Sequence, residues 1–376
     1  MPINPDVLRW ARERSGFSAD EAAQKSHPRL PQWEAGEDQP TYPQLEQLAD
    51  FLHLPVAVFF FPEHPRLPEV RNSFRTLPQA EFDMIPPRVR WLIAKAKAMQ
   101  LNLEELCDGK NPAPHLITHD LTFGPGYDVH RSASAVREYL RITIETQFSW
   151  PNNEAALKAW RELLQSVGIF VFKEAFRADN YSGFSVADDT FPIIFANNSS
   201  SKARQAFTLF HELAHLLART SGIDTLDGTY LRGLQGDSRA LEVACNALAS
   251  QILMPDDAFL EIVRGRDHSE QTAELVADRF HVSREVVYRR FLDRRWITRD
   301  EYLAAKERWD THFHRDSGSG GDYYNTKMAY LGREYISLAL SAFYQNRINE
   351  SKLGDYFDTS PRNALVLAER FAQSAA

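Results

Sequence analysis

The chain has 376 residues and a net charge of -8, with 43% hydrophobic and 12% aromatic residues. This composition predicts a folded protein of two or three domains and argues against a generic nucleic-acid coat. Two cysteines, Cys107 and Cys245, support no disulfide framework. No stretch resembles a membrane span or a secretion signal, so we expect a cytoplasmic protein without a membrane partner.

Residues 1–64 contain the start and stop signals of several short helices. Ser18 with Glu21 and Thr41 with Gln44 have the spacing of capping boxes, in which a hydroxyl and a carboxylate or amide satisfy the first N–H groups of a helix. Apolar residues recur at helical spacing after each box. We therefore predict a small helical domain here.

The succession EAAQK, LPQWEAGEDQPT and QLEQLADFL resembles an Xre-type helix-turn-helix domain, with Arg29 and Gln32 on the segment that would enter the major groove. Pro28 and Pro31 shorten that segment because proline lacks the N–H donor. Residues 1–64 also hold five basic residues against ten acidic ones, a net charge of -5. Contacts to phosphates need positive charge, so we expect the domain to hold protein surfaces together instead of reading DNA.

Residues 65–129 read as a helical connector, and the catalytic core is predicted over 130–258. In the core, Leu157, Trp160 and Leu164 recur at helical spacing, and the short apolar runs IFVF, YSGFSV and FPIIFAN predict the strands of a small sheet. We expect FPIIFAN to border the cleft and to pair with an extended peptide; its alternative role is that of an ordinary strand.

The stretch FTLFHELAHLL, residues 207–217, places His211, Glu212 and His215 in the pattern His-Glu-x-x-His. On a helix, positions i and i+4 lie about 40° apart, so both imidazoles can grip one metal ion while Glu212 lies beside it. Two imidazoles leave room for a third protein ligand and for a water molecule. The apolar residues fall on the opposite side of the helix, which favours a zinc site over a chance match.

A second helical run, EVACNALASQILMP, supplies Glu242 as the third ligand. The alternative for Glu242 is a solvated helix charge, but the run is otherwise apolar and rich in small residues. Asn246 lies one turn further on the same face, where its amide could accept the free N–H of a metal-bound histidine and fix the ring.

Residues 259–316 have the spacing of another helix-turn-helix, and residues 279–299 hold seven arginines and two acids, a net charge of +5. A solvated helix face is the ordinary interpretation. The sharper hypothesis is contact with nucleic acid or an acidic partner through the arginines of the second helix and its end: Arg284, Arg289, Arg290, Arg294 and Arg295. Residues 317–376 follow as a C-terminal helical module whose last helix begins at Ser360-Pro361.

HELAH followed by ExxCN and ILMP resembles the ImmA/IrrE family of bacterial metallopeptidases, and the flanking segments match a common longer architecture of that family. The resemblance implies a mostly helical α+β fold with a zincin-like core and helix-turn-helix-like flanks. By position it makes His211, His215 and Glu242 the Zn²⁺ ligands and Glu212 the general base.

Three further side chains are candidates for stabilising the oxyanion, Tyr181, Tyr230 and His268, although each has an ordinary structural role as its alternative. Cys107 has two interpretations. A free thiol is usually a small buried hydrophobe, whereas a thiolate from this preceding segment could fill the open zinc position and inhibit the enzyme.

The resemblance implies a zinc endopeptidase that cleaves an Xre-type repressor and so derepresses stress, phage-defence or mobile-element genes, with single-stranded DNA or DNA damage as a possible trigger. The expected partner is therefore a helix-turn-helix repressor. The alternative is a DNA-binding regulator or antitoxin whose zinc site is structural or vestigial.

Overall fold

The computed structural model describes residues 2–65, 85–124, 126–178, 180–220, 222–225, 236–313 and 322–375. The chain divides into two compact units, Met1–Lys97 and Ala98–Ala376. The boundaries predicted near residues 130, 259 and 317 therefore fall inside the second unit. Among the described residues no helix combines the length and the apolar character needed to cross a membrane.

The first unit is helical throughout its described part. It contains α1 (Pro5–Arg14), α2 (Ala19–Lys25), α3 (Leu30–Ala35), α4 (Tyr42–Leu52), the 3-10 helix η1 (Val56–Phe60) and the beginning of α6 (Pro87–Leu106). Both predicted capping boxes are present, at the start of α2 and of α4.

A buried ion pair joins α1 to α3 in this unit. The Arg12 guanidinium donates to both carboxylate oxygens of Glu34, at 2.7 and 3.0 Å, and Trp33 beside it is fully buried. Helix α3 has six residues, with Pro31 in its first turn, and ends at Gly36 in a left-handed conformation with φ of 74°. The short segment leaves Gln32 exposed, while Arg29 precedes the helix as its cap.

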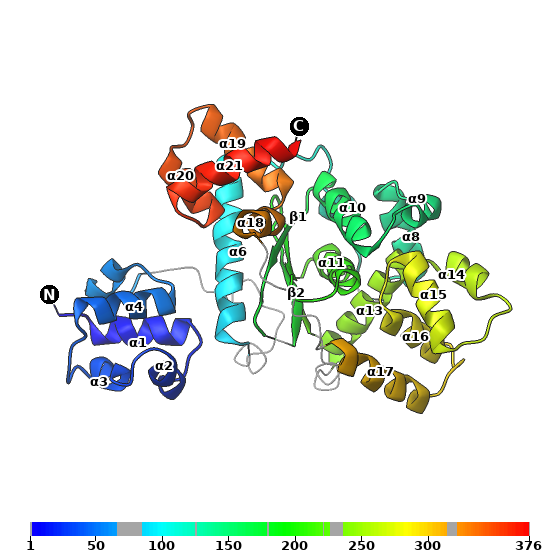
Figure 1. The fold of residues 1–376 in the computed structure, drawn as a ribbon, viewed down its shortest axis with the longest axis horizontal. Coiled ribbons are helices and arrows are strands. Elements are labelled where there is room, and N and C mark those ends of the chain that lie inside the picture. The colour runs from blue at the N-terminus through cyan, green and yellow to red at the C-terminus, as the bar shows by residue number, and fades with distance from the viewer. Residues whose placement is uncertain are drawn as a thin grey trace. The chain divides into compact units, whose positions relative to one another are not determined.

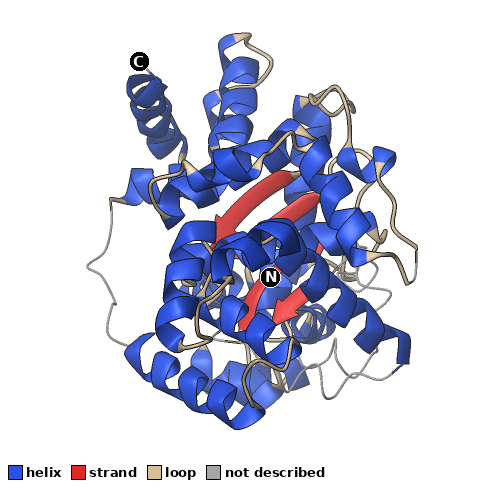
Figure 2. Ribbon diagram, turned by 90° about the vertical axis from the view of Figure 1, so that its right-hand side faces the viewer, coloured by secondary structure: helices blue, strands red, loops and turns tan. Residues whose placement is uncertain are grey.

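The second unit combines helices with a small sheet, as expected for a mostly helical α+β fold (Figure 2). Its strands are β1 (Phe170–Glu174), β2 (Tyr181–Val186), β3 (Ile193–Asn197) and β4 (Ile223–Thr225). Besides the end of α6, its helices are α7 (Ile117–Asp120), α8 (Val129–Tyr139), α9 (Ile144–Phe148), α10 (Asn153–Ser166), α11 (Lys202–Leu217), α13 (Gly236–Leu253), α14 (Asp256–Val263), α15 (Glu270–Phe280), α16 (Arg284–Asp293), α17 (Arg299–Phe313), α18 (Tyr323–Leu331), α19 (Arg333–Tyr344), α20 (Glu350–Phe357) and α21 (Pro361–Ala375).

The strand order is β1-β3-β2-β4, and this order corrects one expectation. Strand β3, the FPIIFAN segment, pairs in parallel with β1 and antiparallel with β2, so both of its edges are occupied. An interior strand has no free N–H and C=O groups for an added peptide. Among the described strands, β4 forms the edge next to α11, where Gly222 meets the His215 ring.

Helices cover both faces of the sheet (Figure 1). Helices α10 and α11 lie on one side, where Trp160 packs edge-on against Phe210 in the main core. On the other side, Gln100 of α6 donates to Phe191 O at 3.0 Å, and the Tyr335 ring of α19 packs edge-on against Phe172 of β1. The C-terminal module is thereby part of the second unit and shares its packing.

Three buried side chains cap the C-terminal end of α13. The carbonyls of residues 252, 253 and 254 accept hydrogen bonds from Arg137 Nη1 at 2.8 Å, from Gln147 Nε2 at 2.8 Å and from Arg290 Nη1. These donors come from α8, α9 and α16. The last carbonyls of a helix lack partners within the helix and carry partial negative charge, so buried cations stabilise them.

We expect Arg290→Ala to lower the free energy of unfolding by about 3 kcal/mol, because it leaves the buried Met254 O and the partly buried Ser250 Oγ without the guanidinium that donates to them. Chemical denaturation of the full chain measures this change. Arg289→Ala is the matched control, since the neighbouring Arg289 is exposed and should contribute little. Equal effects of the two substitutions would contradict a capping role.

Candidate metal centre

Helix α11 carries two of the candidate ligands on one side. Ser201 caps its start by accepting a hydrogen bond from Arg204 N at 3.2 Å. His211 and His215 then follow one helical turn apart, and they are 1% and 2% exposed. Helix α13 packs against α11 and brings Glu242 to the same place, with 12% of its side chain exposed. The sequence spacing and the packing of two helices thus converge on one nearly enclosed point.

The donor atoms of these three residues form a compact triangle. The two Nε2 atoms lie 3.2 Å apart, Glu242 Oε2 lies 3.3 Å from His211 Nε2, and Glu242 Oε1 lies 3.2 Å from His215 Nε2. Ligand bonds of about 2.0–2.1 Å at tetrahedral angles put neighbouring donors about 3.3–3.4 Å apart. The geometry therefore fits one divalent cation held by two nitrogens and one oxygen.

The electrostatics of the triangle also favour a cation. Burial raises the pKa of the Glu242 carboxyl, but the positive charge of His215 and hydrogen bonds from both histidines outweigh it and hold that pKa well below its usual range. Burial lowers the pKa of His215, yet the negative charges that Cys245 and Glu242 can carry raise it above its usual value. The lowered pKa of Glu242 and the raised pKa of His215 have the same cause, because a buried anionic group requires positive charge beside it.

The Thr220 hydroxyl orients the His215 ring, and sequence reasoning missed this residue. It donates its hydrogen to His215 O at 3.1 Å and lies 3.3 Å from His215 Nδ1. Because its hydrogen is already used, the hydroxyl accepts from Nδ1–H. The lone pair is then on Nε2, the atom that faces His211 and Glu242.

Gly222 makes room for the same ring. A Cβ atom at this position would lie 2.2 Å from His215 Cδ2. The close approach is fixed by two hydrogen bonds to β2, from Ser185 N to Gly222 O at 3.0 Å and from Gly222 N to Ser185 Oγ at 3.2 Å. A glycine at the start of an edge strand is the sequence signal that could have indicated this contact.

The other residues predicted for catalysis are placed as follows. Glu212 is fully buried on α11 beside His211. His268 stacks on Trp296 with 4.4 Å between ring centroids. This stacking agrees with the alternative interpretation of His268, an ordinary structural role. Tyr181 begins β2 opposite Thr225, and Tyr230 lies outside the described residues.

Asn246, predicted to accept the free N–H of a metal-bound histidine, lies on α13 and is partly buried. For His215 the neighbour of Nδ1 is Thr220 Oγ1. For this ring, a threonine in the loop after α11 therefore has the role assigned to an amide on α13.

The thiol beside the site is Cys245, which corrects the hypothesis of an inhibitory Cys107. Cys245 is fully buried and close enough to His215 to shift its pKa. Cys107 follows the end of α6, where its charged neighbours are Glu334, Asp108 and Arg347. Burial, with the negative charge of Glu334, raises the pKa of the Cys107 thiol to about 11. A protonated thiol in that place is a poor metal ligand.

The arginines predicted to contact nucleic acid are mostly engaged within the protein. Arg290 is 7% exposed and bonded to Met254 O and Ser250 Oγ, so it is withdrawn from the predicted contacts. Arg295 is exposed. The remaining three form ion pairs: Arg284 with Glu274 at 3.7 Å, Arg289 with Asp293 at 3.0 Å and Arg294 with Asp256 at 2.7 Å.

Residues 164–292 match the family model described as the IrrE N-terminal-like domain. The matched region runs from the end of α10 to α16 and contains the sheet, α11 and α13. No curated protein matches the chain in sequence. The match and the ligand triangle together support a metallopeptidase of the IrrE/ImmA type in this part of the chain, and the first unit and the C-terminal module lie outside the match.

We expect Gly222→Ala to remove bound metal, because the added methyl overlaps the His215 ring. Metal content after dialysis and far-ultraviolet circular dichroism would show loss of the metal with retention of helices. Gly124→Ala is the matched control, because a Cβ there meets no atom within 4 Å. Native metal content in the Gly222 variant would disprove the close contact.

Thr220→Val keeps the shape of the side chain and removes the hydroxyl. It should lower metal affinity about 10- to 100-fold, as loss of an orienting partner does at other metal sites. Competition with a chromophoric chelator measures the affinity, and Thr122→Val, at an exposed threonine, controls for the substitution itself. An unchanged dissociation constant would mean that the ring is oriented by its packing alone.

Proposed function

We propose that the protein is a zinc-dependent endopeptidase that cleaves a partner Xre-type repressor and thereby derepresses stress, defence or mobile-element genes. The observation that carries this proposal is the triangle of His211, His215 and Glu242, with donor atoms 3.2–3.3 Å apart. The match to the IrrE N-terminal-like domain supports the peptidase chemistry. Its extension to a repressor substrate rests on the resemblance of the whole chain.

Two imidazole nitrogens and one carboxylate oxygen form a donor set suited to Zn²⁺ in hydrolytic sites. When bound, zinc supplies Lewis-acid chemistry, polarising a carbonyl and making water more acidic. Among the chain's own residues, Glu212 is the one we assign to proton transfer. Its carboxylate would take the proton of the attacking water and pass it to the leaving amine.

Strand β4 is the substrate-binding edge that fits this chemistry. It contains only Ile223–Thr225, it pairs on one side with β2, and Gly222 before it touches the His215 ring. An extended peptide added along β4 would pass directly over the metal ligands. Main-chain hydrogen bonds would then hold the scissile bond while side-chain contacts elsewhere select the protein.

A repressor-cleavage assay tests the proposal. The zinc-loaded protein is incubated with the helix-turn-helix protein encoded beside it, with and without single-stranded DNA, and a discrete fragment is sought. Glu212→Gln should abolish cleavage and leave metal content unchanged, since glutamine cannot accept the proton. Glu307→Gln, at an exposed glutamate of α17, is the matched control.

The outcomes separate the candidate functions. Near-native cleavage by Glu212→Gln would contradict the assignment of the general base. A stoichiometric metal content without cleavage under any condition would favour the regulator or antitoxin with a structural site. Cleavage that requires single-stranded DNA would identify the trigger, and cleavage without it would exclude that dependence.

A further inference from the structure

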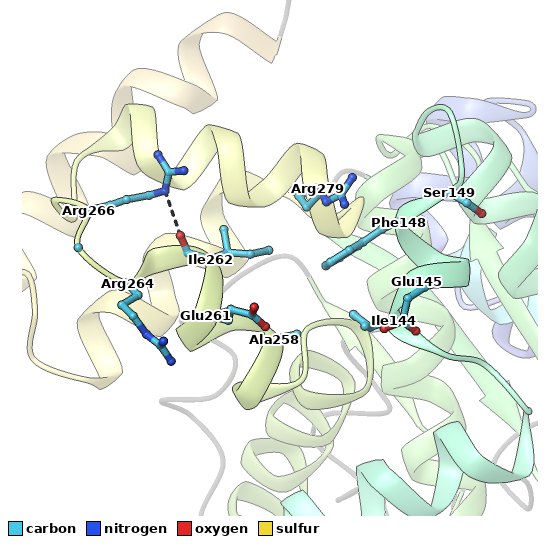
Figure 3. A pocket seen from close by; sticks show the side chains of 11 residues that line it. Ile144, Glu145, Phe148, Ser149, Ala258, Glu261, Ile262, Arg264, Arg266 and Arg279 are labelled. Carbon is cyan, nitrogen blue, oxygen red and sulfur yellow. Dashed lines mark hydrogen bonds between the residues drawn. The ribbon is translucent and has the colours of Figure 1, made fainter.

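A groove lies between α9, α14 and the end of α15, on elements that contribute no metal ligand. It has a volume of about 870 Å³. Its lining residues are Ile144, Glu145, Phe148, Ser149, Ala258, Glu261, Ile262, Arg264, Gly265, Arg266 and Arg279. Figure 3 shows apolar side chains along the middle of the groove and charged ones around them.

Three arginines surround this groove, and within the described part of the chain none of them forms an ion pair. Two are partly held: the Arg279 guanidinium lies over the Phe148 ring, 4.2 Å from its centroid, and Arg266 Nε donates to Ile262 O at 3.0 Å. Arg264 is exposed at the end of α14. The arginines of the adjacent α16 instead have carboxylate partners, at 3.7 Å or less. The groove therefore presents three arginines that have no ion-pair partner among the described residues.

The apolar floor consists of half-buried side chains. Ile144 and Phe148 come from α9, and Ala258 and Ile262 come from α14. An apolar stripe flanked by charge, and bordered by helices without a free strand edge, is suited to a helix that lays its own apolar face into the groove.

A protein helix fits the groove better than a nucleic acid does. Glu145 and Glu261 line it and would repel phosphates. Phe148 is the one aromatic ring of the lining, and Arg279 already covers its face, so no free ring remains on which a base could stack. The same two glutamates would accept hydrogen bonds from a basic or amide side chain of a protein.

We propose that this groove binds an acidic amphipathic helix of a partner protein, with apolar residues on the floor and carboxylates facing Arg264, Arg266 and Arg279. The charge of the groove selects the partner, and the pre-placed Arg279 limits the ordering cost of binding. This surface is independent of the metal centre, so it can be tested without knowledge of the substrate.

The probe is a fluorescently labelled helical peptide of about 18 residues, with leucines along one face and glutamates beside them. Binding to the full-length protein is followed by fluorescence anisotropy. Arg264→Glu with Arg266→Glu should weaken binding about tenfold or more, because two attractions become repulsions. Glu145→Gln with Glu261→Gln should tighten it, since two repulsive charges are removed.

Two controls make the test specific. Arg295→Glu with Arg299→Glu changes charge equally at exposed positions outside the groove and should leave the affinity unchanged. A peptide with lysine in place of each glutamate should bind about tenfold more weakly than the acidic one. Failure of the acidic peptide to bind, or equal binding by the Arg264/Arg266 variant, would overturn the proposal. Tight binding of single-stranded DNA that this variant loses would assign the groove to nucleic acid instead.

Discussion

Helices α11 and α13 must lie close enough for one carboxylate to reach two imidazoles, and much of the second unit depends on this contact. His211 and His215 are almost fully buried, and Glu242 is 12% exposed. Buried ionisable groups are stable only with partners at bonding distance, because water cannot replace a lost contact. A shift of either helix would therefore leave charge unpaired in the interior. The packing around the site opposes that shift. Because Gly222 has no side chain, its backbone lies directly against the His215 ring.

Buried arginines connect the helices around this contact by donating hydrogen bonds to the carbonyls at helix C-termini. Arg137 and Arg290 cap the end of α13, and Arg161 donates to Ala329 O and Tyr330 O at the end of α18. Burial lowers the pKa of each of these guanidinium groups to about 10, which leaves them charged at neutral pH. Arg137 and Arg161 have carbonyls, not carboxylates, as their hydrogen-bond acceptors on these helices. The partial negative charge of a helix C-terminus thus replaces a counter-ion and ties distant segments of the chain together.

Local patterns in the sequence predicted the helices and strands well. The features that sequence reasoning missed depend on contacts between residues far apart in the chain. The capping boxes, the strand FPIIFAN, the last helix beginning at Pro361 and the two histidines on one helix side follow from residues a few positions apart. The interior position of β3 depends on its pairing with two other strands, which no local pattern encodes. The same limit explains why Cys245, and not Cys107, lies at the site. Thr220 was missed because its role depends on the hydroxyl geometry of a loop.

Charge counted along a sequence also differs from charge presented in space. Residues 279–299 carry a net charge of +5, yet Arg290 is buried and Arg284, Arg289 and Arg294 are ion-paired, partly with acids outside that stretch. Asp256, which pairs with Arg294, belongs to α14. The same helix ends in Arg264, whose charge has no such partner in the described structure. Folding therefore withdraws much of the positive charge of this segment, and the groove beside α9 combines Arg279 of the same segment with Arg264 and Arg266, next to carboxylates and apolar side chains. A surface with that mixture discriminates among protein partners, because a phosphate backbone cannot satisfy its glutamates.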